Sequence, residues 1–504
     1  MARLPHRVGA RVHRAHRREP GITGDLERSP HVDSRWLWFR RARTVSPVET
    51  IDDGGEWWLP EAPDRKVSGW LTFTVDDGAQ LRLVGSFRDM QEEGVRHGEG
   101  AVWMTEDSIE RAGSYPRILG RIGNKAFTLE GCHRSSLRRN LFGGPAVEVI
   151  RVDQVYRGVW YEPDEEGCGD GIAVRLAHLV YWLRPEALKE VSRWWLQDGQ
   201  LLDEPVIEVA AKDLPSIVIE RPTGTLKVVQ QLGTKGDGIA LRSITQDFVA
   251  RFDTESVRPW RELIRPVVEF QDVVSLAMDR VASIEAVSLF HPDLVEERPN
   301  GPAYRRTIDV FAQWSDRAAW VEPKDLVSSD VLFHYQVIGA DGLRQLLDAA
   351  ARYRDELRRV SATRGGRTMY NSDRLLNCCA ALESFDRRRL GPGRRGFKKR
   401  IGACISLAGE PFADLVHDTQ GWFDVLKQRR NDVAHHLESL EEANGFTDLL
   451  MADSTYLLFA LCFLREASMP STVFELIEKN RRVDWLRRRL PEALNKHSPG
   501  TSEC

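Results

Sequence analysis

The segment QRRNDVAHH, residues 428–436, brings two arginines, an asparagine and two histidines together inside an amphipathic pattern. Apolar residues recur every three or four positions around it, which predicts a helix with one buried side formed by Trp422, Val425, Leu426, Val433, Leu437 and Leu440. Asn431 and His435 are four positions apart and share a face of this helix, whereas Arg430 lies about 140° around it from His435. The segment therefore predicts a packed helix that presents polar and titratable groups beside its buried side.

The spacing between the arginine and the histidine is weak evidence by itself, because Arg11 and His16 repeat it near the N-terminus. A solvated helix face with a chance histidine is the simplest alternative. The context separates the two pairs, since only Arg430 and His435 lie within an apolar repeat of helical period.

Residues 331–495 around this segment predict an all-α bundle, followed by a tail at 496–504. One helix carries an apolar stripe and has Ser372 as its expected N-cap. The apolar run at 455–464 is shorter than the roughly 20 residues that span a membrane, so it predicts a buried helix. The expected helices cover residues 341–360, 372–389, 412–440 with a break near Thr419, and 446–466, with shorter pieces within 472–490.

Residues 46–330 predict a strand-rich region, so the fold class is α+β: a β-sandwich-like region with a long helix, then the bundle. The clearest hairpin pairs residues 66–75 with 80–87 around Asp77 and Gly78. One long helix is expected at 259–284. Further strands are expected at 117–122, 125–132, 146–152, 173–183, 206–211, 216–220, 225–232 and 284–290.

The charge is distributed unevenly along the 504 residues, although the net charge is only −4. Residues 1–45 hold 11 Lys or Arg and 4 Asp or Glu, residues 46–330 hold 33 and 48, and residues 331–504 hold 27 and 23. We therefore expect a basic disordered arm, or a mis-assigned start, at 1–45. Any nucleic-acid chemistry is expected in the C-terminal region, because the acidic middle region repels a polyanion.

Several classes of protein are disfavoured by what the sequence lacks. The N-terminus has no apolar signal core and no run reaches membrane-spanning length, which favours a cytoplasmic protein without a membrane anchor. The seven cysteines show no knuckle spacing, and the HPD segment at 291–293 is interpreted as a loop. No metal and no cofactor are therefore expected.

Two quoted segments carry a resemblance to a known family. RRNDVAHH, residues 429–436, resembles the Arg-Asn-x-x-x-His signature of HEPN domains, helical bundles that often act as metal-independent ribonucleases, and is similar to the ApeA-type group. GGEWWLPEAPDRKVSGWLTFTVDDGAQLRLVGSF, residues 54–87, resembles the opening of the ApeA N-terminal domain. The likeness covers residues 46–495. It implies an antiphage abortive-infection factor, in which the N-terminal part senses or restrains and the HEPN part degrades RNA.

The residues of the motif suit RNA cleavage by attack of the ribose 2′-hydroxyl. An unperturbed imidazole titrates near neutral pH, so His435 can take the hydroxyl proton, and Arg430 can stabilise the growing charge on the phosphate. Asn431 can hold the imidazole or a phosphate oxygen. The resemblance further implies an acidic residue from a neighbouring helix, here Glu383, and a homodimer that joins two such sites.

A basic segment near the motif is the expected RNA-binding element. Residues 387–400 carry eight basic residues and no acidic one, and a solvated interhelical loop is an equally weighted alternative. Phe397 within it is a candidate for stacking on a base. The expected RNA-binding residues are Arg387, Arg388, Arg389, Arg394, Arg395, Lys398, Lys399 and Arg400.

The sequence thus predicts a cytoplasmic endoribonuclease effector of bacterial antiphage defence, which takes RNA as substrate and responds to a phage-derived trigger. The main alternative is a noncatalytic HEPN scaffold that binds RNA or dimerises, with a ligand-sensing N-terminal domain. Retention of Arg430, Asn431 and His435 together favours the nuclease.

Overall fold

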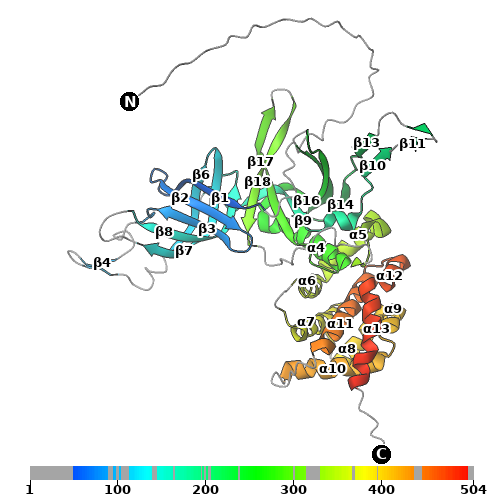
Figure 1. Cartoon of the computed structure of the whole chain (residues 1–504). Coiled ribbons are helices and arrows are strands. Elements are labelled where there is room, and N and C mark those ends of the chain that lie inside the picture. The colour runs from blue at the N-terminus through cyan, green and yellow to red at the C-terminus, as the bar shows by residue number, and fades with distance from the viewer. Residues whose placement is uncertain are drawn as a thin grey trace, which may run out of the picture. The chain divides into compact units, whose positions relative to one another are not determined.

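The computed structural model describes most of the chain after residue 48. The described residues are 49–88, 95–97, 101–103, 113–138, 145–162, 165–193, 196–197, 200–201, 206–236, 239–298, 301–313, 330–365, 369–393, 395–435 and 445–497. The expected basic arm at 1–45 lies outside them. Within this part, strands occupy the N-terminal region and helices the C-terminal region, as the α+β prediction requires (Figure 1).

The first part of the main sheet is a closed antiparallel barrel (Figure 1). Its strands follow the order β8-β3-β2-β1-β6-β7, and β7 pairs with β8 to close the ring. The predicted sandwich-like packing is therefore wrong, because the sheet closes on itself instead of folding into two layers. The barrel strands are β1 (Ile51–Trp58), β2 (Val67–Thr74), β3 (Gly78–Val84), β6 (Ser114–Ile122), β7 (Lys125–Arg138) and β8 (Val147–Arg157).

Strand β8 also joins the barrel to a second, outer part of the same sheet. Residues 147–152 of β8 pair with β3, and residues 154–157 pair with β18. The outer sheet, in order from β8, consists of β18 (Gly301–Ala312), β17 (Ile284–Arg298), β9 (Cys168–Leu176), β16 (Ser243–Pro259), β15 (Gly224–Lys235) and β14 (Ile217–Arg221). Separate two-stranded pairs are β4 (Val95–His97) with β5 (Ala101–Trp103), β10 (Leu188–Arg193) with β13 (Val206–Ala211), and β11 (Leu196–Gln197) with β12 (Gln200–Leu201).

Local chemistry explains where the strand predictions hold and where they do not. The predicted hairpin is confirmed as β2 and β3, and Gly78 adopts the positive φ of 77° that the turn needs. The predicted strand at 173–183 is only half right, because His178 enters the left-handed region and α3 (Leu179–Leu183) follows. Strand β16 was not predicted, since only the short stretch FVARF, residues 248–252, is apolar within it.

Helix α4 (Trp260–Met278) is the predicted long helix, and it packs against β9 and β16. It ends before the predicted residue 284 because Asp279 caps it in a left-handed conformation, with φ of 52°. The barrel has its own hydrophobic core, whereas a second core runs from the outer sheet through α4 into the C-terminal helices. Helix α4 is therefore part of the support on which the helical region packs.

The C-terminal region follows the predicted helices with three differences. The helix expected at 341–360 is divided at Tyr353, Ser372 lies inside α7 because Tyr370 is its N-cap, and α8 was not predicted. The break expected near Thr419 is confirmed at His417. The helices are α5 (Tyr335–Arg352), α6 (Arg354–Ala362), α7 (Asn371–Leu390), α8 (Phe397–Ala408), α9 (Glu410–Val416), α10 (Thr419–His435), α11 (Gly445–Glu466), α12 (Ser471–Glu478) and α13 (Arg481–His497).

Helix α11 is the central helix of this region. It contacts α7, α8, α9 and α13 (Figure 1), and every residue from 450 to 464 is buried. Its length and composition would allow it to cross a membrane, but 94% of its apolar window is buried inside the fold. The prediction of a buried helix at 455–464 is therefore confirmed.

Five charged side chains, which we call the buried ion cluster, connect α4 with the C-terminal helices. They are Asp279, Arg364, Arg374, Asp453 and Arg482. Asp453 lies 2.7 Å from Arg364, 2.8 Å from Arg374 and 2.8 Å from Arg482. Asp279 lies 2.9 Å from Arg364, an ion pair without hydrogen-bond alignment, and 3.0 Å from Arg482. The two aspartates thus fix the C-terminal end of α4 to α11 and α13.

Candidate active site

Helix α10 is oriented by its buried side and by one buried ion pair. Trp422, Val425, Leu426 and Val433 are buried, as the apolar repeat predicts. Arg429, on the same helix, donates two hydrogen bonds to Asp448 of α11, at 2.8 and 2.9 Å. These contacts fix the rotation of α10 about its axis, and they leave Arg430 and Asn431 partly exposed.

Arg430 is held by three neighbours at the surface between α7, α8 and α10. Its Nη2 lies 3.5 Å from Oε1 of Glu383, and its Nη1 donates a hydrogen bond to Oδ1 of Asn431 at 3.3 Å. The guanidinium also lies over the ring of Phe397, 5.1 Å from its centroid. The side chains of Arg430 and Glu383 are 33% and 24% exposed. A positive charge is thus positioned where a solvent-borne anion can reach it.

Glu383 reaches this position from α7, which packs against α10. Cys379, one turn earlier on α7, is buried beneath the pair. Burial raises the pKa of the Cys379 thiol, and the nearby charges of Cys378 and Glu383 raise it further while Arg430 opposes them. The thiol therefore stays protonated, and a buried, uncharged side chain lies beneath Arg430 and Glu383.

His435 is the last residue of α10, and its side chain lies outside the described residues. Its backbone position is one turn after Asn431, the i to i+4 relation that the sequence predicts. Leu437 and Leu440, predicted for the buried side, lie outside the described part as well. The structure thus brings Arg430, Asn431 and Glu383 together and positions the helical turn from which His435 projects.

The basic segment at 387–400 is not one loop, so that part of the prediction is wrong. Arg387, Arg388 and Arg389 form the last turn of α7, and Lys398, Lys399 and Arg400 lie in the first turn of α8. Acidic residues that lie outside the segment form ion pairs with several of its arginines. Because these acidic residues are not part of the segment, its sequence does not reveal the pairing. Arg394 lies outside the described residues.

Several of these arginines bind carboxylates of the protein itself. Arg400 is 5% exposed and lies 3.0 Å from Asp386, which Arg395 also contacts at 3.3 Å. Arg389 lies 2.6 Å from Glu466, and Arg388 pairs with Asp355 and Glu356. Arg387, Lys398 and Lys399 have no carboxylate partner among the described residues. RNA binding by this segment remains a prediction, and Arg400 is the residue whose burial fits it least.

Two contacts at the site were missed by the sequence reasoning. Phe397 was considered as a base-stacking residue, but its ring lies under Arg430 and next to Phe423. The signal for α8 was present, because Phe397, Ile401, Cys404 and Ala408 recur at helical spacing. The role of Asp448 as the partner of Arg429 had no local signal, since it depends on how α11 packs.

A cavity and a group of metal-capable side chains in the described part of the chain both lie away from α10. A cavity of about 300 Å³ on the barrel is lined by Pro116, Arg117, Glu130, Gly131, Asp153, Gln154 and Arg261. The group that brings metal-ligand atoms together is Glu165, Cys168 and His291. Neither the cavity nor the group includes a residue of α7, α8 or α10.

Comparison with known proteins gives one family. The family model described as ApeA N-terminal domain 1 matches residues 54–344, which include the barrel, the outer sheet, α4 and the start of α5. No curated protein and no solved structure matches the chain. The matched region confirms the resemblance seen at residues 54–87 and leaves the helices from α6 onward outside it. Because the match covers more than half of the chain, the protein belongs to the ApeA N-terminal domain 1 family, which associates it with ApeA-type antiphage defence.

Proposed function

We propose that this protein is a metal-independent endoribonuclease of the HEPN type, acting in the cytoplasm as an effector of antiphage defence. The observation that carries the proposal is the meeting of Arg430 and Asn431 on α10 with Glu383 on α7. The Arg-Asn-x-x-x-His motif and the family resemblance assign these residues to one site. Packing of distant segments then had to bring Glu383 within 3.5 Å of Arg430.

Arg430 supplies the electrostatic part of the mechanism. Glu383 and Asn431 hold the guanidinium in place, and the aromatic ring of Phe397 supports it from one side. Two parallel donors of an arginine fit two oxygens of a phosphate, and they gain most when negative charge grows in the pentavalent transition state. A bound phosphate would pair with Arg430 either together with Glu383 or in place of Glu383.

His435 supplies the proton transfer. In the cleavage step the 2′-oxygen of the ribose bonds to the adjacent phosphorus, the bond to the 5′-oxygen breaks, and a 2′,3′-cyclic phosphate and a 5′-hydroxyl are formed. His435 takes the proton of the 2′-hydroxyl as general base, and the departing 5′-oxygen takes a proton from water. Asn431, one turn before it on α10, orients the imidazole or a phosphate oxygen. The reaction therefore needs one arginine and one imidazole and no metal ion.

A homodimer completes the proposed site. Arg430 and Glu383 lie on the surface between α7, α8 and α10, and a two-fold axis through this surface would place two copies in one groove. Lys398 and Lys399 begin α8 beside Phe397 and can contact the backbone of the RNA there. The N-terminal domain is the part assigned to sensing a phage-derived trigger.

The proposal is tested by phage infection of cells that express the full chain. Wild type should protect the culture and fragment cellular RNA, whereas Arg430→Ala and His435→Ala should do neither. Lys427→Ala is the matched control, because Lys427 is an exposed cation on the same helix. All variants are compared at equal soluble abundance.

The same experiment separates the nuclease from the scaffold alternative. Protection lost in Arg430→Ala and His435→Ala but kept in Lys427→Ala supports catalysis at α10. Protection by the two site variants equal to that of wild type would overturn the nuclease and favour a binding or dimerisation role for the helical region.

A further inference from the structure

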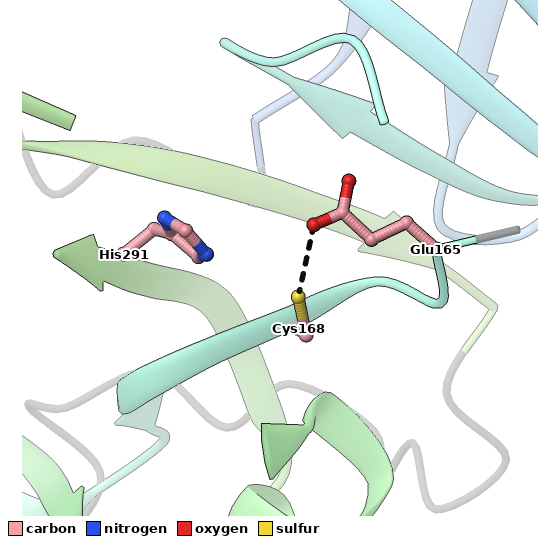
Figure 2. A group of neighbouring side chains, drawn as sticks. All are labelled: Glu165, Cys168 and His291. Carbon is pink, nitrogen blue, oxygen red and sulfur yellow. Dashed lines mark hydrogen bonds between the residues drawn. The ribbon is translucent and has the colours of Figure 1, made fainter. Parts of the chain in front are cut away.

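Three side chains with different metal-binding atoms converge at the connection between the barrel and the outer sheet. Glu165 lies in the loop between β8 and β9, Cys168 begins β9, and His291 lies on β17. One ligand atom from each lies within 4.8 Å of the other two. Figure 2 shows the carboxylate, the thiol and the outer nitrogen of the imidazole ring pointing toward a common space. The sequence did not indicate this group, because 123 positions separate Cys168 from His291.

The loop that carries Glu165 and Cys168 is already fixed by the protein. Arg117 of β6 donates hydrogen bonds to the carbonyl oxygens of Glu162 and Glu165. The hydroxyl of Tyr161 donates to the carbonyl of Cys168 at 3.1 Å and accepts from its N–H at 3.3 Å. Little conformational entropy is therefore lost when the side chains bind a ligand.

His291 is positioned by an irregularity in β17. The register between β17 and β18 shifts between Phe290 and Val295, and such bulges re-aim side chains that a regular strand would direct elsewhere. The carboxylate of Asp293 lies 3.6 Å from Nδ1 of His291. Nδ1 also accepts a hydrogen bond from the backbone N–H of Asp293 at 3.3 Å, so the proton of the neutral ring is on Nε2. A metal ion at Nε2 replaces this proton, and Nδ1 then carries the ring proton and can donate it to the Asp293 carboxylate.

The charges of the group also favour a cation. Sγ of Cys168 lies 3.9 Å from Oε1 of Glu165, and the residue is only 8% exposed. A thiolate and a carboxylate at this distance repel each other unless a positive charge lies between them. A divalent ion would balance both anions while the neutral imidazole supplies the third ligand.

We propose that Glu165, Cys168 and His291 bind a divalent transition-metal ion of the zinc class, with water as the fourth ligand. Sulfur and nitrogen donors select zinc-like ions over magnesium or calcium, which prefer oxygen donors alone. Donor atoms in a tetrahedral zinc site are separated by about 3.5 Å, so ligand atoms that lie up to 4.8 Å apart have to approach one another by as much as about 1.3 Å. On binding, the thiol releases its proton to solvent and the sulfur–metal bond forms.

The site would tie β9 to β17 at the point where the chain leaves the barrel. The N–H of Trp260, the first residue of α4, donates to the carbonyl of Gly167 at 2.9 Å. The same loop therefore contacts the barrel through Arg117 and α4 through Gly167. A metal ion here fixes the geometry between the barrel and α4, and it acts independently of RNA cleavage at α10.

The test uses the purified full chain and cobalt(II) as a spectroscopic substitute for zinc. Wild type should bind one equivalent of cobalt(II) with a thiolate-to-cobalt charge-transfer absorption. Cys168→Ser should lose this absorption, and His291→Ala should lower the affinity at least about a hundredfold, more than the loss of an outer-shell partner. Glu165→Gln, a conservative change in a loop, should lower it at least about tenfold. His133→Ala is the matched control, because His133 is exposed on β7.

Each outcome decides the proposal. One equivalent of cobalt(II) in wild type and His133→Ala, with the charge-transfer band lost in Cys168→Ser and weaker binding in Glu165→Gln, supports the site. No bound cobalt(II) in wild type overturns it, and so does unchanged binding in the folded Glu165→Gln and Cys168→Ser variants. None of these measurements depends on RNA cleavage, so the result stands whether or not the nuclease proposal holds.

Discussion

Two arginine–carboxylate clusters in the C-terminal region use the same side chains in different surroundings. In the buried ion cluster, the side chains of Arg364 and Asp453 are 4% and 3% exposed. At the candidate active site, Arg430 is 33% and Glu383 is 24% exposed, and their 3.5 Å contact is longer than the 2.7 Å contact of the buried pair. Both aspartates and Arg364 of the first cluster are closed to solvent, although Arg482 at its edge is 38% exposed, whereas both members of the second pair are accessible.

The difference shows how the same chemistry serves stability in one place and function in another. Three arginines and two aspartates lie in ion-pair contact in the buried ion cluster, so removal of one aspartate leaves uncompensated positive charge. Arg430 has one carboxylate partner at a longer distance and keeps the capacity to bind a second anion. Helix α11 links the two clusters, because Asp453 belongs to the first and Asp448 anchors Arg429 beside the second.

The largest effect is expected from Asp453→Asn. Arg364, Arg374 and Arg482 lose the carboxylate they share, which should destabilise the folded chain by about 3–5 kcal/mol. Urea unfolding of the full chain, followed by circular dichroism, measures this. The matched control is Asp424→Asn, an exposed aspartate on α10, for which we expect a change within about 0.5 kcal/mol. Equal stability of the two variants would show that the buried cluster does not hold the helices to α4.

Arg430→Ala should impair RNA cleavage and leave stability nearly unchanged, whereas Asp453→Asn mainly lowers stability. We expect RNA cleavage to fall by about 10²–10³-fold, as for other lost donors to a transition-state oxyanion. Unfolding should change by less than about 1 kcal/mol, because the pair is partly solvated. Cleavage by purified wild type, Arg430→Ala and Lys427→Ala provides the comparison. A variant with full cleavage activity, or one that unfolds as readily as Asp453→Asn, would remove the distinction between the clusters.

The buried ion cluster should also make the stability of the folded chain depend on pH. Burial opposes ionisation of Asp453, but Arg364, Arg482 and Arg374 prevail and hold the pKa of its carboxyl well below its usual range. A lowered folded-state pKa contributes stability above the unfolded-state pKa of about 3.9, and the contribution is lost as the pH falls further. The difference in unfolding free energy between wild type and Asp453→Asn should therefore shrink below about pH 5. A difference that stays constant down to pH 3 would contradict this account.

The smallest effect is expected from the basic segment. Replacing Lys398 and Lys399 with alanine should leave stability unchanged and weaken RNA binding, with a lower salt dependence. Filter binding at several salt concentrations measures this, and an unchanged salt slope would exclude the two lysines from the RNA interface.

The parts of the fold that could be predicted from sequence are those with local signals. The hairpin at Gly78, helix α4 and the apolar side of α10 each follow from a turn residue or a repeat within a few turns. Barrel closure depends on β8 pairing along both edges, which no local pattern encodes. Strand β16 and helix α8 were missed because short or charged stretches obscure their periodicity.

The same reasoning applies to the sites. Arg430, Asn431 and His435 lie within six consecutive positions, so a motif identifies them. Glu383 was predicted from the family resemblance. His291 and Cys168 become neighbours only because β17 pairs with β9. The partners of Arg388 and Arg389 likewise come from other helices, α6 and α11, whereas Arg400 pairs with Asp386 of α7, directly before the basic segment. These pairs are why a run of positive charge in the sequence did not remain a free basic loop.

The most direct test of the central claim is the chemistry of RNA ends in phage-infected cells. We would measure new 2′,3′-cyclic phosphate ends in cells that express wild type, Arg430→Ala or Lys427→Ala at equal abundance. The account predicts that these ends accumulate with wild type and Lys427→Ala and are absent with Arg430→Ala. Equal accumulation with Arg430→Ala, or protection from phage without any such ends in wild type, would contradict it.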